Sequence, residues 1–322
     1  MTPSESERQP GEYPTYYERP VIKSGHWRWL IIGYFWSGGI AGGSYLLAMM
    51  AELFGGEADR PIARWGRYLA FFFGAIVSPV LLILDLGRPS RFYNMLRIFK
   101  PRSPMSVGSW GLSVFGFFSS MSAFLQAARD GLLRPLGPLG ALGRALPFKP
   151  FESVGAFFGL FMSGYTGVLL SNATVPLWAK GYKTKGATFL SSALATSSAA
   201  ISLLMALTDN ETDTAQRRLH HVQRGAMLVE GALLAYDVHH LGPLRHYLLR
   251  GAAAPYFYGA VVSGLLVPLL MRLPASRSGR LLKALLTIVG GLLYRAATVL
   301  GGHASAEDPQ GYFYHTDPRR RD

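Results

Sequence analysis

Eight long apolar segments, separated by mostly short connections, constrain this chain more than any other feature of its sequence. A helix of about 20 mostly apolar residues is long enough to cross the hydrocarbon core of a bilayer. The segments are residues 27–53, 64–86, 107–128, 151–171, 186–207, 220–240, 252–271 and 281–301. The first five are the clearest, whereas charged residues interrupt the sixth and the eighth. We therefore expect an all-α integral membrane protein with eight transmembrane helices.

The segments fall into two groups of four, divided by a connection that is rich in Pro and Gly. We expect each group to form a four-helix bundle. The expected division is a polar N-terminal segment (1–26), a first bundle (27–128 and 151–171), a linker (129–150), a second bundle (186–301) and a polar C-terminal tail (302–322). The N-terminal segment has no apolar stretch after a basic start, so we do not expect a signal peptide.

Only 16% of the 322 residues are charged, against about 25% in a typical soluble domain. The formal net charge is +13, which in a soluble protein would suggest nucleic acid binding. Here the Lys and Arg residues cluster at the ends of apolar segments, where lipid phosphates account for them. We predict contacts with lipids and no nucleic-acid partner.

The sequence has no cysteine, which excludes disulfides, thiolate-held iron–sulfur clusters and zinc–cysteine sites within it. A haem held by two histidines would need two imidazoles that face each other at the same depth. His221 and His239 lie 18 residues apart on one segment, about 27 Å along a helix. No histidine falls in the middle of a segment. We predict no haem, no iron–sulfur cluster and no metal site in this protein.

Eight crossings would place both ends of the protein on one side of the membrane, which we call side A; the other is side B. Polar residues collect at side A: His26 precedes the first segment, Asp85 ends the second, and Ser109 and Trp110 open the third. Tyr165 lies six residues from the side-A end of the fourth, about 9 Å deep. Ionisable groups at such positions are costly and usually functional. We predict His26, Asp85 and Tyr165 as catalytic residues.

Imidazole, phenol and carboxylate groups beside apolar surface suit a lipid-soluble quinone. Its tail requires hydrocarbon, and its oxygens require hydrogen-bonding groups near the interface. Quinol oxidation also releases protons, which a His or an Asp can accept as a general base. The predicted quinone contacts are His26, Tyr165, Trp110, Arg88 and Ser109. Both menaquinone and ubiquinone are compatible with these groups.

The stretch 85–110 holds five basic residues and three prolines between two apolar segments. This composition is not needed in a loop exposed to solvent. It is typical of a polar site at a membrane interface that docks against an acidic partner or an anionic lipid head group. Nothing in this sequence could accept the electrons of a quinol. We therefore predict that a partner subunit with an electron carrier docks near residues 87–106.

The sixth segment carries Glu230 near its middle and Asp237 near its side-A end. A carboxylate at mid-membrane depth is often part of a proton path, although it can also be neutral and hydrogen-bonded between helices. We name Glu230 and Asp237 as a candidate proton path. The alternative function is a membrane anchor or proton-conducting subunit without a working quinone site, in which these carboxylates and Arg295 would matter.

Three motifs resemble those of the NrfD/polysulfide-reductase membrane-subunit family. Residues 36–48 (Trp-Ser-Gly-Gly-Ile-Ala-Gly-Gly-Ser-Tyr-Leu-Leu-Ala) resemble its Gly-rich first helix. Residues 85–110 resemble its signature, Asp-Leu-Gly-Arg-Pro followed by Phe-Lys-Pro-x-Ser-Pro-Met-Ser and Gly-Ser-Trp, and residues 165–178 begin with Tyr-Thr-Gly. The resemblance implies an eight-helix core in two four-helix bundles, in a bacterial cytoplasmic membrane.

The resemblance also implies a site and partners. The head group of a (mena)quinone would lie near His26 and Tyr165, and a ferredoxin-like iron–sulfur subunit would dock on the same side. Molybdenum or multihaem cytochrome subunits would complete some of the assemblies, and some would move protons. The family site uses a polar amide just before the histidine, where this protein has Lys23.

Overall fold

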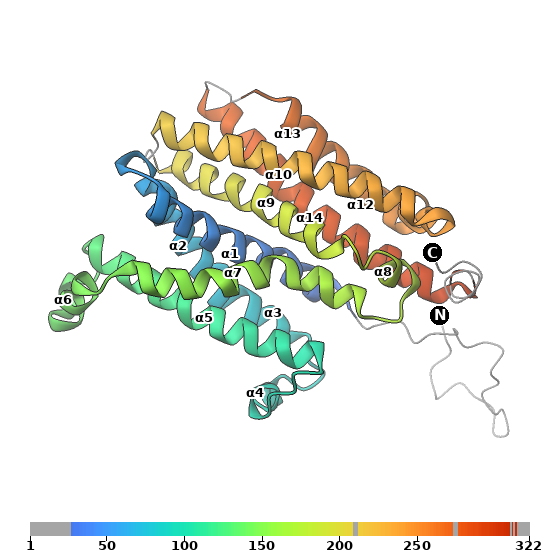
Figure 1. The fold of residues 1–322 in the computed structure, drawn as a ribbon, viewed down its shortest axis with the longest axis horizontal. Coiled ribbons are helices and arrows are strands. Elements are labelled where there is room, and N and C mark those ends of the chain that lie inside the picture. Colours follow the sequence, from blue (N-terminus) through green and yellow to red (C-terminus); the bar gives the residue numbers. More distant parts are fainter. Residues whose placement is uncertain (1–26, 209–211, 273–275, 310, 312, 314–322) are drawn as a thin grey trace.

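Helices make up most of the computed structural model, which describes residues 27–208, 212–272, 276–309, 311 and 313 (Figure 1). Within these residues, seven helical segments are long and apolar enough to cross a membrane. They are α1 (Trp29–Phe54), Glu57–Leu84 with α2 (Arg60–Phe71) and α3 (Ser78–Leu84), α5 (Pro104–Arg129), α7 (Phe148–Ser171), α9 (Lys185–Leu207), Gly251–Leu270 with α12 (Ala254–Gly259) and α13 (Val267–Leu270), and α14 (Arg277–Glu307). The prediction of an all-α membrane protein is confirmed.

The sixth predicted segment forms α10 (Asp213–His240), a helix of 28 residues. It is long enough to cross a membrane but is not among the seven candidate spans, because its composition is too polar. It packs along α9. The count of eight crossings therefore stays a prediction that depends on this helix.

The direction of the helices agrees with the expected alternation. α1 begins, and α14 ends, at the right of Figure 1, where α8 (Pro176–Lys180) also lies. α6 (Pro138–Ala145) lies at the opposite end. We keep the name side A for the right-hand end and side B for the left-hand end.

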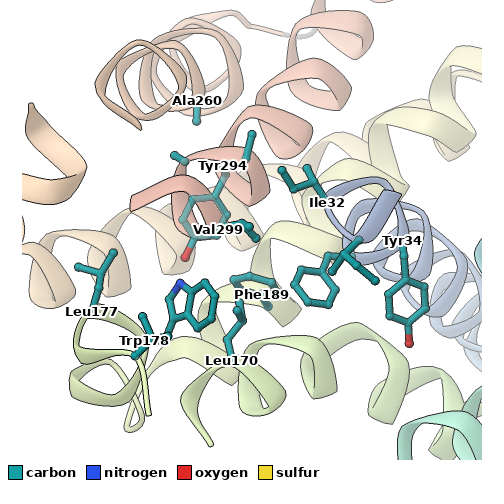
Figure 2. Packing of buried hydrophobic residues seen from close by; sticks show 14 of the residues in the cluster. Ile32, Tyr34, Leu170, Leu177, Trp178, Phe189, Ala260, Tyr294 and Val299 are labelled. Atoms are coloured by element: carbon teal, nitrogen blue, oxygen red, sulfur yellow. The ribbon is translucent and has the colours of Figure 1, made fainter. Parts of the chain in front are cut away.

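The core is centred on α9, which contacts α1, α7, α10 and α14. Phe189 of α9 packs edge-on against Tyr294 of α14, with ring centroids 5.5 Å apart, and Trp178 lies beside them (Figure 2). The buried apolar residues form two clusters, and each cluster contains residues from both halves of the protein. The division into two four-helix bundles is accordingly left as a proposal.

Small residues allow the helices to approach closely. A Cβ atom built on Gly42 of α1 would lie 2.4 Å from the Gly159 carbonyl oxygen of α7. The closest approach is in the second half, where a Cβ on Gly290 would lie 2.0 Å from the Cα of Gly264. A larger residue at either position would force the helices apart.

Two spans contain a wider, π-helical stretch, η4 (Phe72–Val77) and η9 (Ala260–Leu266). Each stretch is followed within two residues by a proline, Pro79 or Pro268. A proline has no N–H to donate and its ring collides with the carbonyl one turn earlier, so the helix must widen there. Hydropathy alone did not predict these stretches.

The helices of the predicted linker and of the predicted tail differ from the expected boundaries. The predicted linker 129–150 contains α6, whose Gly143 packs against Phe124 and Ala128 of α5. In addition, α14 continues through Glu307, so the first residues of the predicted tail are helical.

Candidate functional site

A cleft of about 380 Å³ lies on the side-A half of the first four spans, between α3 and α5. Residues 92–96, which include part of α4 (Asn94–Arg97), form its third wall. Its lining is mostly apolar, and Phe92 and Phe117 are partly exposed there. The cleft therefore has the shape and polarity to hold an apolar molecule that enters from the lipid.

The polar groups in the cleft are hydroxyls on α5. Ser109, Ser113 and Ser120 all line it. Each hydroxyl donates to a carbonyl of its own helix, at 2.9, 2.9 and 2.7 Å respectively. Their oxygens keep the capacity to accept a hydrogen bond from a ligand.

Three consecutive residues of α5 face three directions, as the helical turn of about 100° per residue requires. Gly108 faces α7, where its missing side chain makes room for the ring of Tyr165. Ser109 lines the cleft. Trp110 packs edge-on against Phe99, with ring centroids 6.0 Å apart, and its indole nitrogen is buried without an acceptor in the described part of the protein. One residue of the Gly-Ser-Trp motif thus allows α5 to pack against α7, and the next forms part of the cleft wall.

Tyr165 of α7 is 9% exposed and stacks on Phe161, with ring centroids 4.5 Å apart. Its hydroxyl donates to the Pro104 carbonyl at the start of α5. Tyr34 of α1 is buried and close enough to Tyr165 to interact with it electrostatically. Tyr165 is not part of the cleft lining, from which Gly108 and Ser109 separate it.

The remaining predicted site residues lie around the cleft or beyond the described residues. Asp85 directly follows α3 and is half-buried, and Arg88 is exposed three residues later. Of the predicted site residues, Ser109 lines the cleft, whereas the proposed contacts Arg88 and Trp110 and the proposed catalytic residue Asp85 do not. His26 lies outside the described residues. Its role, and the meeting of His26, Asp85 and Tyr165 in one hollow, stay predictions.

The segment 87–106 covers the side-A end of the cleft with an exposed surface that is both basic and apolar. Its basic residues, all exposed, are Arg88, Arg91, Arg97, Lys100 and Arg102. Tyr93, Ile98 and Phe99 are each more than half exposed. No acidic residue occurs in this segment. Such a surface suits a partner that combines negative charge with apolar contacts.

Glu230 of α10 is buried deep in the second half, beside Arg295 of α14 and Ser192 of α9. Arg295 is only 1% exposed and donates to the Ser192 hydroxyl and to the Phe189 carbonyl. Its Nε has no acceptor among the described residues. The carboxylate that the sequence predicts at mid-membrane depth therefore has a cationic neighbour.

Asp237 of α10 is also buried, at the side-A end of the second half. It accepts a hydrogen bond from the Thr184 hydroxyl, and the ammonium of Lys185 lies 3.6 Å from it. Lys185 is itself buried, at 2% exposure. Sequence reasoning treated this lysine as a flanking charge, because it stands just before the predicted fifth segment.

Sequence reasoning also missed a charged cluster at side B, formed by Arg67, Glu52, Glu152 and Gln126. Arg67 contacts Glu152 at 2.5 Å, Glu52 at 2.7 Å and the Gln126 side chain at 2.6 Å. It borders a polar cavity of about 610 Å³. We call these four residues the Arg67 cluster. The sequence gives little indication of this cluster, because its residues stand near the ends of the predicted segments, where charged side chains usually face water.

Comparison with known proteins identifies the family. A family profile described as "Polysulphide reductase, NrfD" matches residues 21–305. A polysulfide reductase component from Wolinella succinogenes is 28% identical over 157 residues, which are 45% of this protein and 47% of that one. A selenate reductase component from Mesobacillus selenatarsenatis is 29% identical over 89 residues, 28% of this protein and 20% of that one.

The match thus spans less than half of each of these relatives. The family profile, in contrast, covers every span from α1 to nearly the end of α14. The chain therefore belongs to the polysulphide reductase NrfD family, as its three motifs predict.

Proposed function

We propose that this protein is the quinone-exchanging membrane subunit of a respiratory electron-transfer complex. The observation that carries the proposal is the apolar cleft between α3 and α5, which lies beside the motif Gly108–Trp110. Family membership supports it, since the two relatives are named as parts of a polysulfide reductase and a selenate reductase. Here either menaquinone or ubiquinone would be the membrane electron carrier.

The residues of the cleft fit a quinone. Its apolar walls suit the ring and the isoprenoid tail. Next to the wall residue Ser109, but outside the lining, the buried indole N–H of Trp110 is a donor that the described residues leave unused. Ser109 offers an acceptor in the wall itself. His26, Tyr165 and Arg88 complete the proposed contacts, and His26 and Asp85 are the proposed proton acceptors.

The membrane arrangement is part of the proposal. α10 would be the eighth crossing, since it is 28 residues long and buries Glu230 and Asp237, while its residues His221 and Arg224 are exposed. Polar residues inside a membrane protein normally face the helix bundle in this way. We propose two four-helix bundles that share α9 contacts, in the cytoplasmic membrane of a bacterium.

Electrons would leave through a partner, because the sequence has no cysteine for a cluster. The segment 87–106 is the proposed docking surface for a ferredoxin-like iron–sulfur subunit. A molybdenum or multihaem cytochrome subunit would complete the complex. Glu230 and Asp237 form the proposed proton path.

Light-activated labelling tests the quinone site. An azido-quinone in membranes that contain the complex should label peptides of residues 79–83, 92–96 or 109–120, and excess quinone should compete with it. The variant Ser113→Phe fills the cleft and should reduce labelling about tenfold, the scale of about 1.4 kcal/mol of binding. Labelling that Ser113→Phe leaves unchanged would contradict the site.

Ser153→Phe is the matched control for this experiment. Ser153 also bonds a carbonyl of its own helix, at 2.8 Å, but it is exposed and lies on α7 away from the cleft. The control should label like the unmodified protein.

The second candidate function is a membrane anchor or proton-conducting subunit without quinone chemistry. One observation favours it: the Tyr165 hydroxyl is bonded to the Pro104 carbonyl rather than directed into the cleft. Tyr165→Phe separates the two functions. If the phenol orients a quinone, quinol oxidation falls severalfold while the protein stays folded, since one such hydrogen bond stabilises by only about 1 kcal/mol.

A further inference from the structure

The buried face of α10 carries polar residues along its whole length. From side B to side A they are Gln216, His220, Gln223, Glu230 and Asp237, and every one of them is less than 9% exposed. Their spacing of three, four or seven residues keeps them on one side of the helix. The facing side of α14 carries Lys283, Thr287, Tyr294 and Arg295, all buried. Two polar faces therefore meet across the second half.

Direct contacts and two small cavities join these residues. Glu230, Thr196, Tyr294 and Thr287 line one cavity of about 10 Å³. The Thr287 hydroxyl accepts a hydrogen bond of 2.9 Å from the Gln223 amide. Gln223 then lines a second cavity of about 10 Å³, which it shares with His220 and Lys283. Each cavity has room for about one water molecule, and each offers several polar partners.

The side-B end of this series is a pair of bases. The Lys283 nitrogen lies 3.0 Å from Nδ1 of His220 and 2.9 Å from the Met271 carbonyl oxygen. Two nitrogens at this distance need one hydrogen between them, so either the ammonium donates to a neutral imidazole or the imidazole donates to a neutral amine. The pair thus shares a proton. Arg224, His221 and Arg280 are the other basic groups near it.

Buried polar groups in folded proteins usually have a hydrogen-bond partner. Here the Tyr294 hydroxyl, the Arg295 Nε and one oxygen of Asp237 are buried without a hydrogen-bond partner among the described residues. These atoms follow one another between Glu230 and the side-A end. The Tyr294 hydroxyl and the Asp237 carboxylate, whose free oxygen lies 3.6 Å from the Lys185 ammonium, can pass a proton, whereas Arg295 stays protonated and supplies a fixed positive charge.

We infer that a proton route crosses the second half and opens to side B at the pair of His220 and Lys283. From Glu230 it runs through the first small cavity, past the Thr287 hydroxyl, and through the second small cavity, beside the Gln223 amide, to this pair. Toward side A it runs through Tyr294 to Asp237 and Lys185. The inference deepens the proposed function and rests on it. Oxidation of a quinol passes two electrons to the partner subunit and frees two protons, and the route carries protons between side A and side B.

The test uses the whole complex in vesicles that contain a pH indicator. An electron acceptor that cannot cross the membrane, supplied outside, turns over only complexes with side A outward, so side B faces the interior. Thr287→Val keeps the shape of the side chain but removes the hydroxyl, and Lys283→Met removes a base of the pair. Both should lower the protons that reach the interior per electron about tenfold or more. Electron transfer is measured separately with a protonophore.

Two controls exclude a loss of fold. Thr287→Ser restores the hydroxyl and should restore proton movement. Thr166→Val makes the same change at an equally buried position in the first half, with 1% exposure against 2%, and should behave like the unmodified complex. Normal proton movement in both Thr287→Val and Lys283→Met would overturn the route. Loss of proton movement in Thr287→Val but not in Lys283→Met would show that the route does not open to side B at the pair of His220 and Lys283.

A failure of the proposed function gives a different result. If the unmodified complex oxidises no quinol, the same vesicles are driven by a potassium diffusion potential with valinomycin. Faster proton entry in the unmodified complex than in Thr287→Val and Lys283→Met would still support the route. Equal entry in all three would overturn it.

Discussion

The buried charges of the two halves are organised in opposite ways. In the first half, Arg67 holds Glu152, Glu52 and Gln126 at 2.5–2.7 Å, in a compact cluster beside a large cavity. In the second half, the ion pair of Lys185 and Asp237 is 3.6 Å long, and polar groups continue through the helices toward side B. The first arrangement suits a structural clamp, and the second suits proton transfer.

The cavities of the two halves also differ, in both size and polarity. The first half has an open polar cavity of about 610 Å³ at side B and an apolar cleft of about 380 Å³ on the side-A half. The second half has small cavities of about 10 Å³ between charged and hydroxyl side chains. The comparison suggests a division of labour: the first half binds the quinone, and the second half moves protons.

Removal of the central arginine from each half should give the largest effect and the clearest contrast. Arg67→Ala leaves the buried Glu152 carboxylate, and the partly exposed Glu52 carboxylate, without the cation that they share, which should lower the free energy of unfolding by about 3–5 kcal/mol. Arg295→Ala removes bonds to a hydroxyl and a carbonyl and one charged neighbour, so we expect a smaller loss, about 1–3 kcal/mol. Unfolding of the purified protein in detergent measures both. A larger loss of unfolding free energy in Arg295→Ala than in Arg67→Ala would contradict the assignment of the Arg67 cluster as the structural clamp.

Backbone contact should matter more in the second half than helix propensity. Gly290→Ala places a Cβ against the Gly264 backbone, which cannot yield like a flexible side chain, so we expect a loss of about 1–3 kcal/mol. Gly225→Ala is the control, because a Cβ there meets no other atom within 4 Å. Alanine favours a helix over glycine, so this variant should gain about 0.5–1 kcal/mol. The same unfolding measurement checks both variants. Equal changes in unfolding free energy for Gly290→Ala and Gly225→Ala would contradict the close contact between Gly290 and Gly264.

Replacement of one carboxylate in each half tests the division of labour. Glu230→Gln should reduce proton movement about tenfold without loss of the fold. Glu152→Gln keeps Arg67 paired with Glu52 and should leave proton movement unchanged. Both are measured as protons per electron in vesicles. A proton defect in Glu152→Gln with normal Glu230→Gln would exchange the roles of the two halves.

Surface charge on the segment 87–106 should have the smallest effect. Arg97→Gln or Arg102→Gln removes one exposed charge and should weaken partner binding severalfold, since exposed pairs contribute about 0–1 kcal/mol. The loss should shrink as salt is added, because salt screens exposed charges. Titration of the partner at two salt concentrations checks this. Arg217→Gln, an exposed arginine at the side-B end of α10, is the control and should bind normally.

The sequence predicted most of the spans because length and hydropathy decide which helices cross a membrane. The Gly-rich and Asp85–Trp110 motifs also predicted the family. Polar spans are harder to predict from the sequence. The composition of α10 resembles that of a helix in a soluble protein, because its polar residues lie on a face that is buried against other helices. The π-helical stretches depend on prolines within spans, which hydropathy does not register.

The sequence did not predict the Arg67 cluster, because its charged residues stand near the ends of the predicted segments. Arg67 and Glu152 stand near the ends of their predicted segments, but α2 begins at Arg60 and α7 at Phe148, so both lie deeper than expected. The bonding of the Tyr165 hydroxyl to Pro104 depends on how α7 meets the start of α5. Such pairings between distant segments cannot be read from spacing along one helix.

A structure of the complex, isolated with its native quinone, tests the central claim most directly. We predict a quinone head group on the side-A half of the first four spans, in or beside the cleft between α3 and α5 and next to Ser109. The partner that carries the iron–sulfur cluster should cover residues 87–106. A quinone bound among α9, α10 and α14, or a redox partner seated on side B, would contradict the claim.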